Sequence, residues 1–302
     1  MDRRPKLTSI AIRILAVAAV AAGFTLAAFA GIKFGEAVST PSGSASPPVA
    51  EKPERSRPTP AEAKPKKSRV SWPAKGAEDE AQKIAEDRDG LVSFAAIGPS
   101  GRTMGFDAGR PFFSASVSKA MLLVAELRRL RREDLPLDDA TRATLTQMIT
   151  LSDNVAADAI YARVGDAGLN EVAKVAGMTD YSGDVGHWSN VQFSAGDLAL
   201  FMSELDELLA LQGGEAGSKM LSSVISTQRW GVPQAAPGDA RIRFKGGWRP
   251  SDSGELVHQM ARVDVNGKSY SLAVMTDGNP SQHYGEETIR LIAAELLETD
   301  KR

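Results

Sequence analysis

Apolar and polar residues follow two different periods along the chain, and together these periods predict a mixed α/β protein. The apolar run Leu91–Ile97 and the alternating runs Glu255–Val265 and Lys268–Met275 have the composition of β-strands. Asn266-Gly267 separates the last two runs, and these two residues are typical of a tight hairpin. A shorter β-like run, Asp239–Phe244, precedes them. The hairpin predicts an antiparallel sheet.

Between and after these runs the apolar period changes to that of helices. The segments Ala120–Leu127, Asp138–Thr150 and Val155–Val164 follow one another and predict a group of consecutive helices. The amphipathic segment Glu286–Leu297 predicts a last helix whose apolar face packs on the sheet. The pattern therefore predicts an α/β (α+β) domain, which we place at residues 76–302.

The N-terminal segment, residues 1–36, has a pattern that predicts a membrane segment. A basic leader precedes Ile14–Ile32, which is apolar throughout and long enough for about one bilayer crossing. The positive flank predicts that the N-terminus lies inside the cell. Ala28-Phe29-Ala30 also resembles a signal-peptidase site, so the segment is either a cleaved signal peptide or a single-pass anchor. The length of the apolar run favours the anchor. Both alternatives place the rest of the chain outside the cytoplasm.

Residues 37–75 are predicted to be a disordered linker. They hold 8 of the 16 prolines of the chain and almost no large apolar residues, so they cannot bury a core. In a polyproline conformation they would reach on the order of 100 Å, enough to lift a domain off a membrane. Residues 51–75 carry 8 Lys or Arg against 3 Asp or Glu. This charge fits contact with an anionic wall polymer or lipid head groups, and it equally fits a solvated linker.

Composition excludes several classes of site. The chain has no cysteine, which excludes disulfides and zinc–thiolate sites, and its three histidines are too widely spaced for a metal-ligand pattern. Neither a G-x-G-x-x-G motif nor a P-loop is present, so nothing indicates nucleotide binding. The net charge is −2, and no part of the chain has the pattern of a nucleic-acid-binding face. We therefore expect no metal, no cofactor and no nucleic-acid partner, and a monomeric domain.

Candidate chemistry begins at Ser116-Val117-Ser118-Lys119, directly before the helix predicted at Ala120–Leu127. If that helix begins near Ser116, positions i and i+3 share a face and the Lys119 amine reaches the Ser116 hydroxyl. The free N–H groups of a helix start would stabilise an oxyanion. Apolar surroundings would lower the pKa of the amine and let it act as a base. The spacing alone also occurs on ordinary amphipathic surface helices.

Two later motifs change this interpretation. Ser152-Asp153-Asn154 falls on a short connection between two predicted helices, where a hydroxyl and an amide can project into a cleft, although Asp153 or Asn154 could also cap the next helix. Lys245-Gly246-Gly247 ends the run Asp239–Phe244, where glycines allow another backbone to approach closely. By itself this lysine could equally be an ordinary one before a turn. The three motifs in this order predict a serine acyl-transfer site that uses no histidine.

These motifs resemble those of the penicillin-recognising serine hydrolases: class A β-lactamases, penicillin-binding proteins and D-Ala-D-Ala peptidases. The resemblance extends from near Gly76 to the C-terminus and includes Phe112–Lys119 as the nucleophile segment. It also includes Phe193–Leu198, with Ser194 and Asp197 in capping spacing, as the helix after the omega loop. The resemblance implies terminal helices flanking the antiparallel sheet, an all-helical lobe beside it, and the site between the two.

The resemblance also implies a role for each matching residue. Ser116 would attack an amide or lactam carbonyl, and Lys119 would accept its proton. Ser152 would pass that proton to the leaving nitrogen, while Lys245 would keep the local potential positive and attract the substrate carboxylate. Asn154 would hydrogen-bond the amide of the substrate's side chain.

The segment after Lys245 departs from the family pattern. The backbone N–H groups of Ser116 and Trp248 would form the oxyanion hole, with Gly246 and Gly247 lining the site beside them. The family usually has Thr or Ser where this chain has Gly246, so a hydroxyl that helps to hold the substrate carboxylate is missing. Trp248 is bulky for a strand position in a cleft, and it would either narrow the site or stack on a substrate.

The segment that matches the omega loop departs further. Class A β-lactamases carry a Glu there that activates the deacylating water, and residues 177–193 contain no Glu. Asp180, Asp184 or His187 could replace it, and no motif selects among them. The resemblance therefore predicts an acyl-enzyme that forms at Ser116 and hydrolyses slowly. The substrate would be a β-lactam or a D-Ala-D-Ala-like wall peptide.

Two alternatives to a β-lactamase remain open from the sequence. One is a D-Ala-D-Ala peptidase or esterase of cell-wall metabolism with little lactam turnover. The other is a catalytically weak wall-binding or sensor domain that keeps the fold. The retained serines and lysines favour an enzyme, whereas Gly246 and the loop without Glu favour the weak domain.

Overall fold

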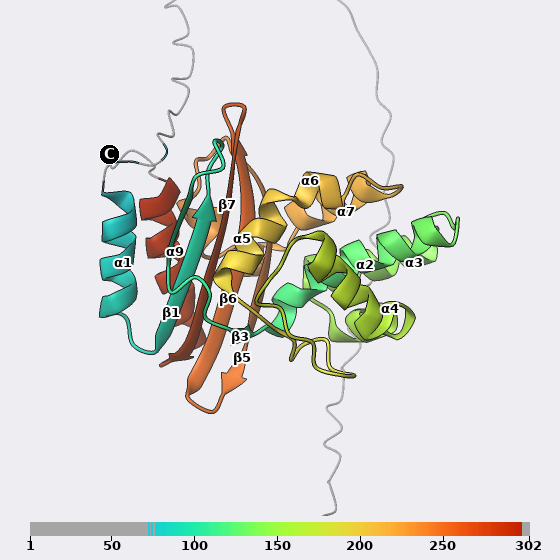
Figure 1. The fold of residues 1–302 in the computed structure, drawn as a ribbon, viewed down its shortest axis with the longest axis horizontal. Helices are drawn as coiled ribbons and strands as arrows, with labels where there is room; N and C mark the ends of the chain where they lie inside the picture. Colours follow the sequence, from blue (N-terminus) through green and yellow to red (C-terminus); the bar gives the residue numbers. More distant parts are fainter. Residues whose placement is uncertain (1–71, 73, 75, 298–302) are drawn as a thin grey trace, which may run out of the picture. The chain divides into compact units, whose positions relative to one another are not determined.

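The computed structural model describes residues 72, 74 and 76–297 (Figure 1). The predicted membrane segment, the C-terminal residues 298–302 and nearly all of the predicted linker lie outside the described residues, so those predictions are not tested. Within the described part of the chain, no helix is long and apolar enough to cross a membrane.

One five-stranded antiparallel sheet, in the order β2-β1-β7-β6-β5, organises the fold. Strand β1 coincides with the run expected from the sequence, and Asn266 and Gly267 turn between β6 and β7 with positive φ angles of 53° and 71°. This turn confirms the predicted hairpin. The strands of the sheet are β1 (Leu91–Ile97), β2 (Thr103–Phe106), β5 (Arg241–Ser251), β6 (Gly254–Val265) and β7 (Lys268–Asn279).

The edge strand β5 corrects one prediction from the sequence. Lys245 lies in the middle of this strand rather than at its end, because β6 pairs without interruption with Gly246, Gly247 and Trp248. Glycines weaken a strand, but a long partner strand compensates for them. Side chains alternate across a strand, so Lys245 and Gly247 belong to one face of the sheet and Gly246 and Trp248 to the other.

Terminal helices cover the face of the sheet to which Gly246 belongs, as Figure 1 shows for α1 and α9. Ile289, Ile292 and Leu296 of α9 are buried in the apolar cluster beneath these helices, which confirms the packing expected for the last helix. The helices of this layer are α1 (Ala77–Asp87), α8 (Val232–Ala235) and α9 (Gln282–Leu297).

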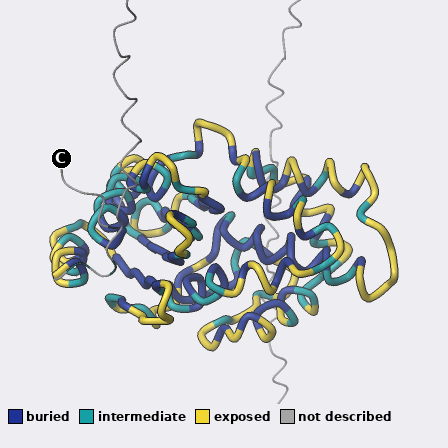
Figure 2. The backbone as a smooth tube through the Cα atoms, turned by 90° about the horizontal axis from the view of Figure 1, so that it is seen from above, coloured by how far each residue is buried: buried dark blue, intermediate teal, exposed yellow. Residues whose placement is uncertain are grey.

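The opposite face of the sheet packs against α5 and leads into a helical lobe around α2. Ten of the 14 residues of α2 are buried, and Figure 2 shows buried backbone inside both the sheet layer and the helical lobe. The elements of this part are α2 (Lys119–Arg132), α3 (Asp139–Thr146), α4 (Asn154–Val175), α5 (Ala195–Ser203), α6 (Leu205–Leu208), α7 (Gly214–Ser222), the two-stranded sheet of β3 (Phe112–Phe113) and β4 (Gln192–Phe193), the 3₁₀ turns η1 (Ala115–Ser118) and η3 (Ser226–Gln228), and the π-turn η2 (Gln147–Leu151).

Two predicted helices differ from the observed ones. The segment predicted as one helix over Asp138–Thr150 ends as α3 and continues as the π-turn η2. Helix α4 runs far beyond the predicted end at Val164, because the chain resumes helical geometry after a break at Gly165. Apolar periodicity reports which residues face the core, and it does not distinguish an α turn from a π turn.

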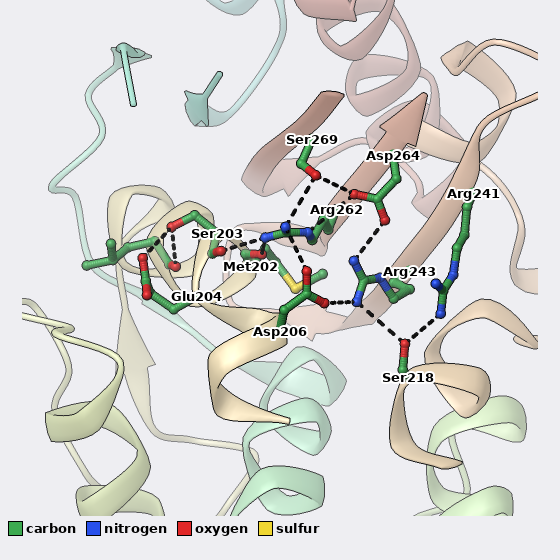
Figure 3. A network of polar contacts seen from close by, with 11 residues as sticks. Met202, Ser203, Glu204, Asp206, Ser218, Arg241, Arg243, Arg262, Asp264 and Ser269 are labelled. Carbon is green, nitrogen blue, oxygen red and sulfur yellow. Dashed lines mark hydrogen bonds and ion pairs between the residues drawn. The ribbon is translucent and has the colours of Figure 1, made fainter. Parts of the chain in front are cut away.

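A network of arginines and aspartates fixes β5 against the helical lobe (Figure 3). Arg243 lies two residues before Lys245, is almost completely buried, and pairs with Asp206 of α6 and with Asp264 of β6. Arg262 of β6 pairs with the same two carboxylates. A buried charge is tolerated only when it is paired. The network therefore determines where the next part of β5, which carries Lys245, meets the lobe.

Candidate active site

The segment around Ser116 forms a strained turn at the start of α2. Ser116 lies in η1, which runs directly into the helix, and the preceding Ala115 has a positive φ of 45°. A non-glycine residue in this region costs about 1–3 kcal/mol and persists only where its surroundings hold it. Here the loop that contains Trp188 holds it, since Ala115 N–H donates to Ser189 O at 3.1 Å. The predicted helix begins as a 3₁₀ turn, and this turn presents Ser116.

Lys119 is completely buried and points at the nucleophile. Its Nζ lies 3.0 Å from Ser116 Oγ, which confirms the contact predicted from the i, i+3 spacing. The same Nζ donates to Ser152 O at 2.6 Å and to Asn154 Oδ1 at 2.7 Å. Burial lowers the pKa of Lys119 to about 8, against smaller opposing effects from the charges of Asp153 and Asp158. An amine with this pKa is available as a base near neutral pH.

Ser152 connects the two lysines of the site. Its Oγ lies 3.3 Å from Lys119 Nζ and 3.0 Å from Lys245 Nζ, and Ser152 itself has a positive φ of 59° at the end of the π-turn. Lys245 is fully buried, and this burial, together with the charge of Lys119, holds its pKa well below the usual range. Asp153 caps α4 through Ala156 N–H at 2.7 Å, so the capping expected for this motif is also present.

Gly247 explains why β5 can approach the nucleophile. A Cβ at this position would lie 2.8 Å from both Ser116 N and Val117 N, distances that no real side chain tolerates. The glycine therefore brings the β5 backbone directly against the start of α2. That approach is what an oxyanion hole made of the Ser116 and Trp248 N–H groups requires.

The family usually has a hydroxyl-bearing residue at the position of Gly246. In this chain a steric contact on the other face of β5 explains the glycine. A Cβ at Gly246 would lie 2.9 Å from two atoms of the Trp230 indole. Trp230 is buried and makes an edge contact with Trp248, with the ring centroids 6.0 Å apart. The indole of Trp230 occupies the space that a side chain at position 246 would need. Its presence therefore explains why this position carries no hydroxyl.

A cavity of about 440 Å³ opens beside Ser116 and contains the predicted binding residues Asn154 and Trp248 in its lining. Its lining also includes Asp158 of α4 and Arg249 of β5. Lys119, Ser152 and Lys245 are not among its lining residues. The predicted site residues are thus brought together, with the reacting groups buried and one side open to solvent.

Three residues of the loop 177–193 were proposed as substitutes for the missing Glu, and one of them lines this cavity. His187 lines it, with Nδ1 3.6 Å from Asp184 Oδ2. Asp184 does not line the cavity, and Asp180 lies beside Gly109 with its backbone N–H bound by Asp197. Position in the fold therefore removes both aspartates as direct contacts of a substrate at Ser116.

Two residues that the sequence did not single out hold this loop. Trp188 Nε1 donates to Asp158 Oδ1 at 2.7 Å, and the indole ring lies 4.9 Å from Lys119 Nζ. Asp158 is the only carboxylate among the described residues that line the cavity. It follows Asn154 by four residues, which places both on one face of a helix, and this spacing was a usable signal in the sequence.

A third missed residue is His258, which is completely buried on β6 opposite Gly247. Its Nδ1 accepts a hydrogen bond from Thr276 N–H at 3.1 Å, so its Nε2 carries the proton that is donated to Phe113 O at 2.9 Å. Burial lowers the pKa of His258 to about 4, and the imidazole is therefore neutral near pH 7. It anchors the strand that leads to Ser116 and takes no part in proton transfer.

No group of three or more histidine and acidic side chains within the described residues is arranged to hold a metal ion.

Comparison with known proteins identifies the family. Residues 140–299, just over half of the chain, match the family model described as the beta-lactamase enzyme family. The chain belongs to this family. It is therefore a β-lactamase-like serine hydrolase, as the three motifs predicted. A search of curated proteins found no match.

Solved structures agree on the fold. A β-lactamase from Sphaerobacter thermophilus matches with a TM-score of 0.64 at 21% identity, over 74% of this chain and 96% of that one. A class A β-lactamase from Mycobacterium abscessus has a TM-score of 0.63 at 18% identity, over 74% and 98% of the two chains. PBP-A has a TM-score of 0.64 at 19% identity, over 76% and 98%. At such identities the likeness establishes the β-lactamase-like fold alone.

Proposed function

We propose that this member of the β-lactamase enzyme family forms an acyl-enzyme at Ser116 with β-lactams or D-Ala-D-Ala-like peptides. One observation carries the proposal: a buried lysine with a pKa of about 8 lies 3.0 Å from the Ser116 hydroxyl, and Ser152 Oγ lies between that lysine and Lys245. This arrangement supplies a base for the nucleophile and a proton path to a leaving group.

Acylation follows from these contacts. The neutral amine of Lys119 takes the proton of Ser116, whose Oγ forms a bond to the carbonyl carbon. The negative charge that develops on the carbonyl oxygen is stabilised by the N–H groups of Ser116 and Trp248. When the carbon–nitrogen bond breaks, Ser152 donates its proton to the nitrogen, and Lys119 returns a proton to Ser152. Lys245, whose Nζ lies 3.0 Å from Ser152 Oγ, attracts the carboxylate of the substrate when it is protonated.

Deacylation is proposed to be slow. General-base assistance to a water molecule contributes ~10²–10⁴-fold, and the loop that covers the site offers no Glu. Asp158, the one carboxylate among the described residues that line the cavity, already accepts the indole N–H of Trp188. We therefore expect acyl-enzyme to accumulate during lactam turnover.

A D-Ala-D-Ala peptidase is the second candidate, and the same observation favours it. A site that acylates readily and hydrolyses a lactam acyl group slowly is the property expected of a penicillin-sensitive peptidase. A domain that only binds wall peptide would not need the base, the bridging serine and the second lysine in contact with one another.

The proposed location is outside the cytoplasm, held by the N-terminal segment as an anchor or released after its cleavage. It rests on the basic leader and on the apolar run Ile14–Ile32. Protease added to intact cells should cut within residues 37–75 and release a penicillin-reactive fragment. Recovery of the activity in the cytosol alone would contradict this location.

Intact-mass measurement of the full chain after exposure to a penicillin tests the proposed chemistry. A single adduct should form and should be absent in Ser116→Ala. Ser118→Ala is the matched control, because Ser118 Oγ donates to Ala115 O inside the same turn and does not face the site. An adduct that survives Ser116→Ala, or that is lost only in Ser118→Ala, would refute the assignment.

A further inference from the structure

The cavity beside Ser116 lies on the side that would receive the acyl part of a substrate. The leaving nitrogen must approach Ser152, which donates its proton, and Ser152 and Lys245 are absent from the cavity lining. The portion of the substrate that stays attached to Ser116 after the carbon–nitrogen bond breaks must then extend into the cavity. The residues that line the cavity therefore select the acyl group.

Strand β5 has an exposed edge along which such an acyl group can bind. It is an edge strand of the sheet, so one row of its backbone N–H and C=O groups is not used by β6. Extended peptides commonly bind by pairing with an exposed edge strand. Along this edge the chain passes from Lys245, on the leaving-group side, to Trp248 and Arg249, which line the cavity.

Arg249 is held in place without a carboxylate partner. Its Nη1 donates to Asn190 Oδ1 at 2.7 Å, and its guanidinium carbon lies 5.3 Å from the centre of the Phe113 ring. No carboxylate of the described part of the chain lies within ion-pair distance of it, in contrast to the network around Arg243. Asn190 and Phe113 thus orient the guanidinium, and most of its five N–H donors stay available to a ligand.

Asp158, the carboxylate of the cavity lining, forms no ion pair with Arg249. It projects from α4 and accepts the indole N–H of Trp188, whereas Arg249 projects from β5. The cavity therefore has a cationic side at the strand along which the acyl group would run. A guanidinium that is already oriented binds a carboxylate in a two-pronged geometry at little entropic cost.

We propose that Arg249 forms an acyl-side carboxylate subsite, so that this enzyme reacts preferentially with acyl donors bearing an anionic group near the scissile carbonyl. The subsite rests on the proposed function, because it selects substrates for acylation at Ser116. Its ligand class is a penicillin with a carboxylate on its acyl side chain, or a D-Ala-D-Ala peptide whose preceding residue ends in a carboxylate.

Benzylpenicillin and carbenicillin test the subsite, because they differ by one carboxylate on the acyl side chain. The second-order rate of acylation of the full chain is measured for each by intact mass. Carbenicillin should react faster, and Arg249→Gln should reduce the ratio of the two rates by about tenfold to a hundredfold, the range of a charge-assisted hydrogen bond. The benzylpenicillin rate serves as the reference and should fall less than the carbenicillin rate. Arg249→Lys keeps the positive charge but loses the planar guanidinium that can donate two parallel hydrogen bonds to a carboxylate, so it should give an intermediate ratio.

Arg241→Gln is the matched control, because Arg241 is an exposed arginine of the same strand that contacts Ser218 of α7 and not the cavity. It should leave the ratio unchanged. Peptides that end in D-Ala-D-Ala and carry either diaminopimelate or lysine before it extend the test to wall substrates, since these residues also differ by one carboxylate. The same loss of preference is expected in Arg249→Gln.

The outcomes separate the subsite from the proposed function. If the unsubstituted chain forms no adduct with either penicillin, the proposed function fails. If both penicillins acylate Ser116 with no preference for carbenicillin, or if Arg249→Gln slows both equally, the function stands and the subsite is refuted. An equal loss in Arg241→Gln would refute it as well, because the effect would then come from the net charge of the protein.

Discussion

The two sides of Ser116 are built in different ways. On the leaving-group side, Lys119, Ser152 and Lys245 are in mutual contact, and both lysines are fully buried. The ion pairs of Arg243 fix the strand that carries Lys245. Groups held this rigidly are already arranged for proton transfer when a substrate arrives.

On the side of the loop 177–193, fewer side chains could take part in proton transfer, and they are more exposed to solvent. Its carboxylate, Asp158, is exposed and hydrogen-bonded to an indole, and His187 is largely exposed. Under the proposed function, the groups that would form an acyl-enzyme and those that could assist its hydrolysis belong to separate parts of the structure. At a pH where Lys119 is already neutral, substitutions on one side should therefore change one step and leave the other unaffected.

The largest effect is expected from Lys119→Met. Loss of the base should slow acylation by ~10²–10⁴-fold, while an apolar side chain of similar length should preserve the fold. Acylation by a penicillin is followed by intact mass, with Lys174→Met, an exposed lysine of α4, as control. An unchanged acylation rate would remove Lys119 from the role of base.

The pH dependence sharpens this prediction. Because the neutral amine is the base and the pKa of Lys119 is lowered to about 8, the acylation rate should rise with pH and level off above about 8. The charge of Asp158 raises this pKa, so Asp158→Asn should move the midpoint to lower pH. A rate that is flat between pH 6 and 9, or a midpoint shifted upward, would contradict the assignment.

Gly247→Ala should have the next largest effect, and again on acylation. The added Cβ would press on Ser116 N and Val117 N, so β5 must move away and the oxyanion contacts weaken. Loss of one such donor typically costs ~10²–10³-fold. Gly238→Ala, just before the same strand, has nothing within 4 Å of the added Cβ and should react normally. Equal rates in the two variants would show that the close approach is not needed.

On the loop side, Asp158→Asn should slow deacylation by about tenfold, which is below the ~10²–10⁴-fold typical of a general base, because the carboxylate is already engaged by Trp188. The amide oxygen of Asn still accepts the indole N–H, so the loop should stay in place and acylation at pH 9 should not fall. Decay of the isolated acyl-enzyme is measured by mass. Asp180→Asn is the control, since Asp180 lies outside the cavity. Slower decay in the control alone would reverse the assignment.

The smallest effect is expected on stability, from Gly246→Ser. The new Cβ would meet the Trp230 indole, and overpacking of this kind costs about 1–3 kcal/mol. The smaller ring of Trp230→Phe should relieve part of that cost in the double variant, as measured by denaturant unfolding. If the two substitutions destabilise additively, the hydroxyl is missing for a reason other than the space that Trp230 occupies.

Much of the fold was predictable because its signals are local. The hairpin at Asn266-Gly267, the cap formed by Ser194 on Asp197 N–H and the buried face of α9 each depend on residues within a few positions of one another. The extent of β5 was not predictable. The two glycines of Lys245-Gly246-Gly247 indicate the end of a strand, and only the pairing of all three residues with β6 shows that the strand continues.

For the candidate site, the sequence by itself determined the order of the three motifs and predicted Ser116 as the nucleophile and Lys119 as its base. The contact between Ser116 and Lys119 was predictable from their i, i+3 spacing, whereas the strained turn that presents Ser116 is held by the loop that contains Trp188. Only the tertiary structure decided that Trp230 fills the space beside Gly246 and that Trp188 donates a hydrogen bond to Asp158. It also decided that Arg249 lines the cavity with Asn190, and no carboxylate of the described residues, as its polar partner. Each of these contacts joins residues from different elements, and their positions are determined by how the sheet and the helical lobe pack together.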